Sequence, residues 1–147
     1  MPVLTGDIVN GKYRVEQVLG EGGMGVVVAA RHLELMELYA IKVMKREVLG
    51  NDAYAEQRFL REARAAARLK GTHVAHVHDI GRLDSGELYM VMEYLRGTDL
   101  NDLVRKHGPL PVQEAVTYIL QTCEALAEAH ALHIIHRDIN RSRVILS

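Results

Sequence analysis

The first half of the chain is organised as short apolar stretches that alternate with polar positions. Residues 13–19 (YRVEQVL) follow a period of two, and residues 26–31 and 38–44 are rich in β-branched and apolar side chains. Both patterns are typical of strands. Short connections between these three segments predict an antiparallel meander. The five expected strands are residues 13–19, 26–31, 38–44, 74–80 and 88–93.

A helix is expected between residues 52 and 69, because apolar side chains recur there at helical spacing. Phe59, Ala63 and the Ala66-Ala67 pair fall at i, i+4, i+7 and i+8. Gly71 follows as a stop signal. This helix separates the first three expected strands from the last two.

The chain changes from strands to helices at Gly97, which we interpret as a hinge. A short helix is expected at residues 99–106, and Pro111 can occupy the first turn of a longer helix that runs to about residue 131. The chain is therefore predicted to be an α+β protein with a strand-rich first lobe and a helical second lobe. The apolar stripe of the longer helix consists of Val112, Val116, Ile119, Cys123 and Leu126.

Composition and charge narrow the class of protein. The 147 residues are 48% hydrophobic and 25% charged, which is typical of a globular domain with a core. A net charge of −1 argues against a general nucleic-acid binder. Cys123 is the only cysteine, so no internal disulfide can form, and we expect it to be a small core residue. The sequence shows neither a signal peptide nor a membrane-spanning apolar run, so we expect a cytoplasmic protein without a membrane partner.

The most informative stretch is the glycine-rich segment at residues 20–27, which reads G-x-G-x-x-G-x-V with Gly20, Gly22 and Gly25. Without a Cβ, such a backbone can approach phosphate oxygens closely and present N–H groups to them. Dinucleotide-binding folds use the same spacing, but there a helix follows at once. Here the β-branched run that follows predicts a strand. Lys42 lies on the next expected strand.

Four motifs, taken in order, resemble those of the bacterial Ser/Thr protein kinases of the eukaryotic-like type. The resemblance extends from Tyr13 to Leu146. It implies a protein-kinase-like fold. Residues 1–12 would form an extension, and residues 13–96 a first lobe with a five-stranded antiparallel sheet and one long helix. Residues 97–147 would form part of the helical second lobe. The motifs are the glycine loop, Ala40-Ile41-Lys42, Phe59-Leu60-Arg61-Glu62-Ala63 and His136-Arg137-Asp138.

The resemblance implies a chemical role for each motif. The glycine loop would cover the phosphates of ATP, and Lys42 would contact the α- and β-phosphates while Glu62 holds it as an ion-pair partner. Asp138 would orient the hydroxyl of a protein substrate that receives the γ-phosphate. Taken singly, Lys42 and Glu62 also fit ordinary surface charges. Four motifs in order favour the kinase interpretation.

The resemblance also implies an adenine site with an apolar roof and floor, a gatekeeper, and backbone groups that reach the adenine edge. The same apolar side chains also fit a plain core, since a purine slot is an apolar gap in a core. The expected residues are Leu19, Val27 and Ala40 for the roof, Met92 as gatekeeper, Glu93 and Leu95 for the backbone groups, Asp99 for the ribose and Ile145 for the floor.

The last residues depart from the family pattern. The family's catalytic loop reads His-Arg-Asp-Leu-Lys-Pro-x-Asn, whereas residues 136–143 read HRDINRSR. Asn140 replaces the lysine that would stabilise the transferring phosphoryl group. Arg143 replaces the asparagine that would bind the second Mg²⁺, and a guanidinium offers no oxygen ligand. The Asp-Phe-Gly motif, whose aspartate holds the main Mg²⁺, is not reached by Ser147, so we assign no metal ligand and expect little or no activity from this chain alone.

Three functions stay open on this sequence. In the first, the chain is the first half of an ATP-dependent Ser/Thr kinase. In the second, it is a degenerate kinase that binds a nucleotide or a partner without transferring phosphate. In the third, it is a relic without function. Asn140 and Arg143 favour the second. We also expect the apolar stripe of the 111–131 helix to be exposed, which would favour association through this helix and an unstable or partner-dependent second half.

Two further clusters allow more than one interpretation. The histidines form an H-x-x-H-x-H pattern that could bind zinc, but we assign no further cysteine or acidic ligand to it, so polar strand positions are favoured. The arginines form a basic stripe on the first expected helix, for which a solvated face is favoured over nucleic-acid binding. The clusters are His73, His76 and His78, and Arg58, Arg61, Arg64 and Arg68.

Overall fold

The computed structural model of the chain describes residues 3–23, 25–45, 54–135, 139 and 144–146. The chain divides into two compact units. The first unit contains residues 1–68 and 75–94, and the second contains residues 69–74 and 95–147. The short segment 69–74 therefore belongs to the second unit, although the chain before and after it belongs to the first.

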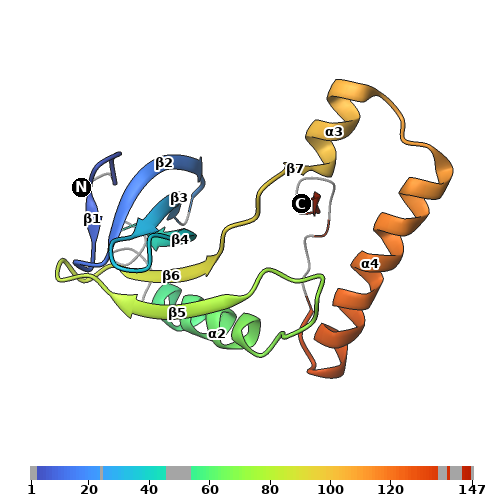
Figure 1. Cartoon of the computed structure of the whole chain (residues 1–147). Helices are drawn as coiled ribbons and strands as arrows, with labels where there is room; N and C mark the ends of the chain where they lie inside the picture. Colours follow the sequence, from blue (N-terminus) through green and yellow to red (C-terminus); the bar gives the residue numbers. More distant parts are fainter. Residues whose placement is uncertain (1–2, 24, 46–53, 136–138, 140–143, 147) are drawn as a thin grey trace. The chain divides into compact units, whose positions relative to one another are not determined.

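The first unit is built on a six-stranded antiparallel sheet (Figure 1). All five predicted strands are present, and the glycine loop joins the first two of them as a hairpin. In spatial order the strands are β1 (Ile8–Val9), β2 (Tyr13–Glu21), β3 (Gly25–His32), β4 (Leu38–Met44), β6 (Leu88–Glu93) and β5 (Val77–Arg82).

The prediction of five strands was wrong by one, because β1 lies in the segment that we had treated as an extension. Val9 is buried and pairs with Tyr13 on β2. Asn10 and Gly11 both have positive φ, and the N–H of Lys12 donates to the carbonyl of Val9 at 3.0 Å. An Asn-Gly pair is the preferred sequence for such a tight hairpin turn, since both central residues need φ above zero.

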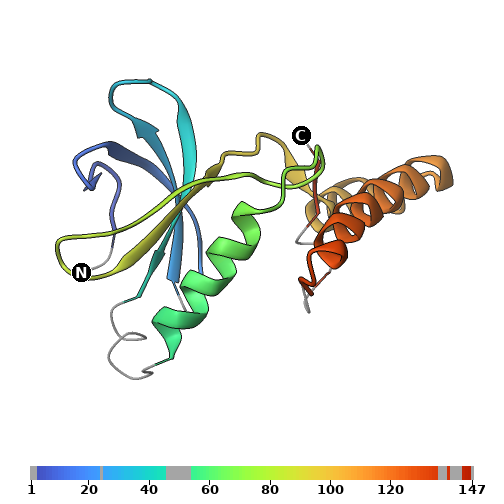
Figure 2. The ribbon, with the colours of Figure 1, turned by 90° about the horizontal axis from the view of Figure 1, so that it is seen from below.

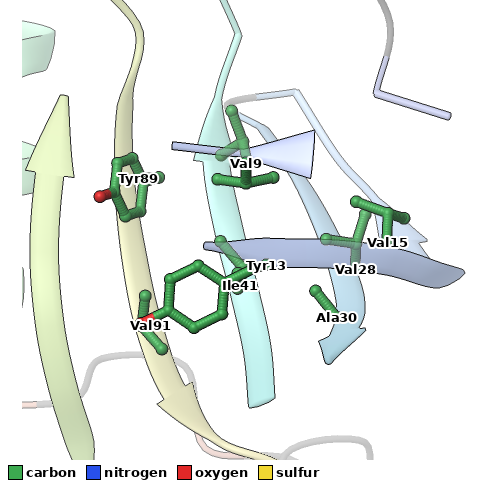
Figure 3. Close-up of a cluster of buried hydrophobic side chains, with 9 residues drawn as sticks. Val9, Tyr13, Val15, Val28, Ala30, Ile41, Tyr89 and Val91 are labelled. Atoms are coloured by element: carbon green, nitrogen blue, oxygen red, sulfur yellow. The ribbon is translucent and has the colours of Figure 1, made fainter. Parts of the chain in front are cut away.

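One face of the sheet carries the main core of the first unit (Figure 3). Val28 on β3, Ile41 on β4 and Val91 on β6 lie in register, and none of them has measurable exposure. Burial raises the pKa of Tyr13 and of Tyr89, and the nearby Asp79 carboxylate adds to both shifts. The core cluster consists of Val9, Tyr13, Val15, Val28, Ala30, Ile41, Val43, Tyr89 and Val91.

Helix α2 (Ala55–Ala67) lies along the opposite face of the sheet, beside β5 and β6 (Figure 2). Its apolar side inserts Phe59 against Met44 and Leu88 in a second, smaller core cluster. The Glu56 carboxylate pairs with the Arg82 guanidinium on β5, which adds a polar tie between helix and sheet. The helix is therefore positioned mainly by one buried aromatic side chain.

The second unit contains two helices and a two-stranded sheet of β7 (Thr98–Asp99) and β8 (Ile145–Leu146). Asp99 is the N-cap of α3 (Leu100–His107), because its Oδ1 accepts a hydrogen bond from the N–H of Asp102 at 2.8 Å. Helix α4 (Val112–Ala131) follows Pro111, as predicted from the fixed φ of proline.

The apolar stripe of α4 is largely exposed in this structure. The exposed fractions are 78% for Val112, 50% for Val116 and 55% for Ile119. Cys123 is exposed as well, so the prediction that it is a core residue was wrong. The physical reason is that α4 turns this side away from the other described residues of its unit. Across the described part of the chain, no helix is both long and apolar enough to span a membrane.

The three histidines of the H-x-x-H-x-H pattern contact different residues. His73 pairs with Glu124 in the second unit, whereas His76 lies 3.8 Å from the Glu93 carboxylate in the first. The ring of His78 packs edge-on against Tyr39. Within the described ranges, no three His, Cys, Asp or Glu side chains are placed to hold one metal ion.

Replacing Phe59 by alanine tests the packing of α2. Phe59→Ala leaves a cavity between the helix and the sheet, so it should lower the free energy of unfolding by about 3 to 5 kcal/mol. Urea unfolding followed by circular dichroism measures the loss. Leu35→Ala is the control, because Leu35 is 62% exposed and its truncation should change stability by less than about 0.5 kcal/mol. Equal effects of the two variants would contradict the packing described here.

Candidate functional site

The glycine loop is the tip of the β2–β3 hairpin. Gly20 pairs with Val27 across the hairpin, and the N–H of Gly22 donates to the carbonyl of Gly25 at 2.9 Å. Both Gly20 and Gly22 are exposed, and a Cβ added at either position would meet no atom of the chain within 4 Å. These two glycines leave an open backbone surface, which suits the approach of a bulky polar ligand.

Gly25 has a different role from the other two glycines. It is buried, and a Cβ at this position would lie 2.4 Å from the carbonyl oxygen of Val43 on β4. The close approach of β3 and β4 therefore requires glycine at this position. Of the three glycines in the motif, one maintains the sheet and two leave its surface open.

Lys42 lies in the middle of the sheet face opposite the main core. It stands in register between Val27 on β3 and Met90 on β6. Two residues earlier, Ala40 stands in register with Met92. Because directly opposed residues share a face, this register brings Val27, Ala40, Lys42 and Met92 onto one side of the sheet. Four of the predicted site residues are thus side by side.

The ion pair expected between Lys42 and Glu62 is not formed in this structure. Among the ion pairs of the described residues, none contains either side chain. Phe59 and Ala63 occupy the buried side of α2, and Glu62 lies about 60° around the helix from Phe59. Glu62 itself is exposed, whereas Lys42 is half-buried.

A second lysine, which the sequence had not singled out, does have an acidic partner beside the glycine loop. Lys45, just after β4, places its Nζ 3.0 Å from the carboxylate of Glu21 at the end of β2. This pair compensates the one negative charge of the loop motif. Repulsion between Glu21 and an anionic ligand is thereby reduced.

The end of β6 carries the expected gatekeeper and the first of the expected backbone contacts. Met92 is half-buried, and the N–H of Glu93 donates to the carbonyl of His76 at 2.8 Å. The Glu93 carboxylate accepts from the N–H of His76 at 3.1 Å. The N–H of Glu93 is therefore already satisfied within the first unit. Leu19 on β2 is 43% exposed and is the unpaired residue at a bulge between Val18 and Gly20.

The second unit contains the remaining expected site residues. Asp99 and Ile145 are directly opposed in the β7–β8 sheet, so two residues far apart in sequence are brought together. Ile145 is 44% exposed, and Asp99 uses Oδ1 to cap α3. Leu95 is half-buried in the segment after β6. Asp138, Asn140 and Arg143 lie outside the described residues.

A hollow of about 540 Å³ on α2 does not coincide with any of these residues. It lies on the side of the helix opposite Phe59. Arg61, Arg64 and Arg68 are exposed along it, as expected for a solvated basic face. Its lining consists of Gln57, Leu60, Arg61, Arg64, Ala65 and Arg68.

Comparison with known proteins decides the family. A family profile described as "Protein kinase domain" matches residues 13–147. The chain belongs to the protein-kinase family. The kinase pkn3 of Myxococcus xanthus is 38% identical over 135 residues, which cover 92% of this chain and 24% of pkn3. PknE of Mycobacterium tuberculosis is 39% identical over 137 residues, 93% of this chain and 24% of PknE. Both are described as serine/threonine-protein kinases.

Solved structures agree with this kinase assignment. The PknI kinase domain of Mycobacterium tuberculosis matches with a TM-score of 0.81 and 34% sequence identity, over 100% of this chain and 60% of that one. The kinase-like fold predicted from the sequence is confirmed. The chain spans about a quarter of the length of the curated relatives described above.

Alanine substitutions in the glycine loop separate structure from ligand contact. Gly25→Ala places a methyl group against the Val43 carbonyl and should cost about 1 to 3 kcal/mol of stability. Gly22→Ala meets no atom of the chain, so stability should change by less than about 0.5 kcal/mol. Thermal unfolding of both variants is the measurement. A larger loss for Gly22→Ala than for Gly25→Ala would be inconsistent with this assignment.

Proposed function

We propose that the first unit of this kinase chain binds ATP on the sheet face that carries Lys42. The observation that supports this most directly is the placement of Lys42. Its strand register sets it beside Val27, which in turn pairs with Gly20 of the glycine loop. Its ammonium has no carboxylate neighbour among the described residues. A half-buried cation next to an open backbone surface suits a polyphosphate.

The residues expected around the adenine ring supply an apolar surface and backbone groups in this proposal. Val27, Ala40 and Met92 offer an apolar surface on the same sheet face, and Leu19 adds an exposed apolar side chain from β2. The adenine edge would meet backbone groups of Glu93 and Leu95. Because the Glu93 N–H is occupied by His76, its carbonyl is the group we assign to the adenine edge. In the second unit, the family resemblance assigns Ile145 to the base and Asp99 to the ribose, the latter through the oxygen that does not cap α3.

In its family the reaction transfers the γ-phosphate of ATP to Ser or Thr hydroxyls of a protein, with Asp138 orienting the hydroxyl. The residues present here do not fit the Mg²⁺ that the reaction needs. Arg143 stands where an amide oxygen would bind metal, and its guanidinium can only repel a cation. We therefore propose nucleotide binding by this chain with little or no transfer by these residues alone. Asn140 and Arg143 favour a binding role for the same reason.

Replacing Lys42 by methionine tests the nucleotide site. Lys42→Met keeps the length of the side chain and removes its charge, so affinity for a fluorescent ATP analogue should fall about tenfold or more. Lys12→Met is the matched control, because Lys12 is an exposed turn residue. Titration by fluorescence anisotropy measures both. Unchanged binding by Lys42→Met would contradict the site. Lys42-dependent transfer from labelled ATP to a basic protein would instead contradict the expected inactivity.

We also propose that α4 associates through its exposed apolar stripe, with a second copy of the chain when it is alone in solution. Three exposed side chains on one side of a helix form an apolar surface of the kind that promotes association. Light scattering should show a mass that rises with concentration. Ile119→Glu should abolish that rise, and Thr117→Glu on the other side of α4 should not. A wild-type chain that stays monomeric at every concentration would rule the association out.

A further inference from the structure

The side of α2 that lies opposite Phe59 concentrates positive charge. Arg61, Arg64 and Arg68 fall at i, i+3 and i+7, so they share one side of the helix. All three are exposed, and they line the hollow of about 540 Å³ on α2. Their Cα atoms span about 10 Å along the helix axis. Three guanidinium groups are therefore gathered on one short surface of a chain whose net charge is −1.

The charges of these three arginines are not compensated within the first unit. Among the ion pairs of the described residues, none includes any of the three. The acidic residues of α2 are Glu56 and Glu62. Glu56 pairs with Arg82 on β5, and Glu62 lies one or two positions from the nearest two arginines, a spacing at which helical side chains do not face each other. Like charges three and four residues apart destabilise a helix, so this arrangement costs stability that an acidic ligand would restore.

The floor of the hollow is apolar. Leu60 packs with part of its side chain against the second core cluster, and both Leu60 and Ala65 are half-buried. The remaining lining residue is Gln57, so the described lining contains no aromatic ring on which a nucleic-acid base could stack. A guanidinium donates two parallel hydrogen bonds to a carboxylate. The hollow therefore matches a polypeptide that carries carboxylates together with an apolar side chain.

We propose that this hollow, which we term the α2 basic surface, binds an acidic segment of another protein. The carboxylates of that segment pair with the three arginines, and an apolar side chain of the segment lies against Leu60 and Ala65. The surface is separate from the proposed nucleotide site, because Lys42 lies on the sheet, whereas the arginines lie on the side of α2 opposite Phe59, which faces the sheet. The proposal does not depend on ATP binding.

Binding of a fluorescein-labelled peptide, EELEELEE, to the full chain tests the proposal by fluorescence anisotropy. A double variant with Arg61→Gln and Arg64→Gln should bind the peptide at least about tenfold more weakly, because two charge-assisted contacts are lost. The matched control carries Arg105→Gln and Lys106→Gln, which remove two exposed cations from the last turn of α3. Its affinity should stay within about twofold of the wild-type value. Equal losses in the two double variants would overturn the proposal.

Thermal unfolding separates lost binding from lost folding. The Arg61→Gln, Arg64→Gln variant relieves like-charge repulsion, so its unfolding midpoint should rise by about 1 to 3 °C. A fall in the midpoint would contradict the repulsion on which the proposal rests. Lys42→Met should leave peptide affinity unchanged, and a loss there would place the peptide on the nucleotide site instead. A wild-type chain that binds the glutamine version of the peptide equally well, or a thymidine oligonucleotide more tightly, would also overturn the proposal.

Discussion

The pairing of β3 with β4 is the constraint on which the rest of the first unit depends. Residues alternate between the two faces of a strand, so a slip of one residue would exchange the faces. In the observed register Ile41 enters the main core and Lys42 stands on the opposite face. A slip would bury the charge of Lys42 and expose Ile41. The close contact of Gly25 with the Val43 carbonyl helps to hold this register, since a larger residue would not fit.

The same register explains why one sheet can combine a stable core and a binding surface. The face that carries Ile41 is filled by β-branched and aromatic side chains, and they need no ligand to be satisfied. The opposite face is only partly covered, because α2 packs on it through Phe59 near Met44 and Leu88. The charged side chains near the glycine loop differ in the same way between compensated and uncompensated positions. Glu21 is compensated by Lys45, whereas Lys42 on the less covered face has no acidic partner among the ion pairs of the described residues.

Much of this could be predicted from the sequence, because strands and motif spacing are local properties. The strand after the glycine loop followed from β-branched residues, and the in-register grouping of Val27, Ala40 and Lys42 follows once the strands are paired. The sixth strand was missed although its signal was present in Asn10-Gly11, because β1 is only two residues long and shows no alternation. The exposure of Cys123 and the lack of a Lys42–Glu62 ion pair depend on tertiary packing, which a single helix pattern does not encode.

Helix α4 shows why an amphipathic pattern alone does not identify the packed side of a helix. Its apolar stripe is exposed, as we expected, and Cys123 on that stripe is exposed too, although we had expected it in the core. Directional contacts of α4 within its unit come from Glu124 and Glu128, which hold backbone and histidine groups of the segment 69–74. Acceptor oxygens that match fixed N–H donors give directional contacts, whereas apolar burial is non-directional. A helix of this kind can define the path of a neighbouring connection through its polar side, while its apolar side stays exposed among the described residues.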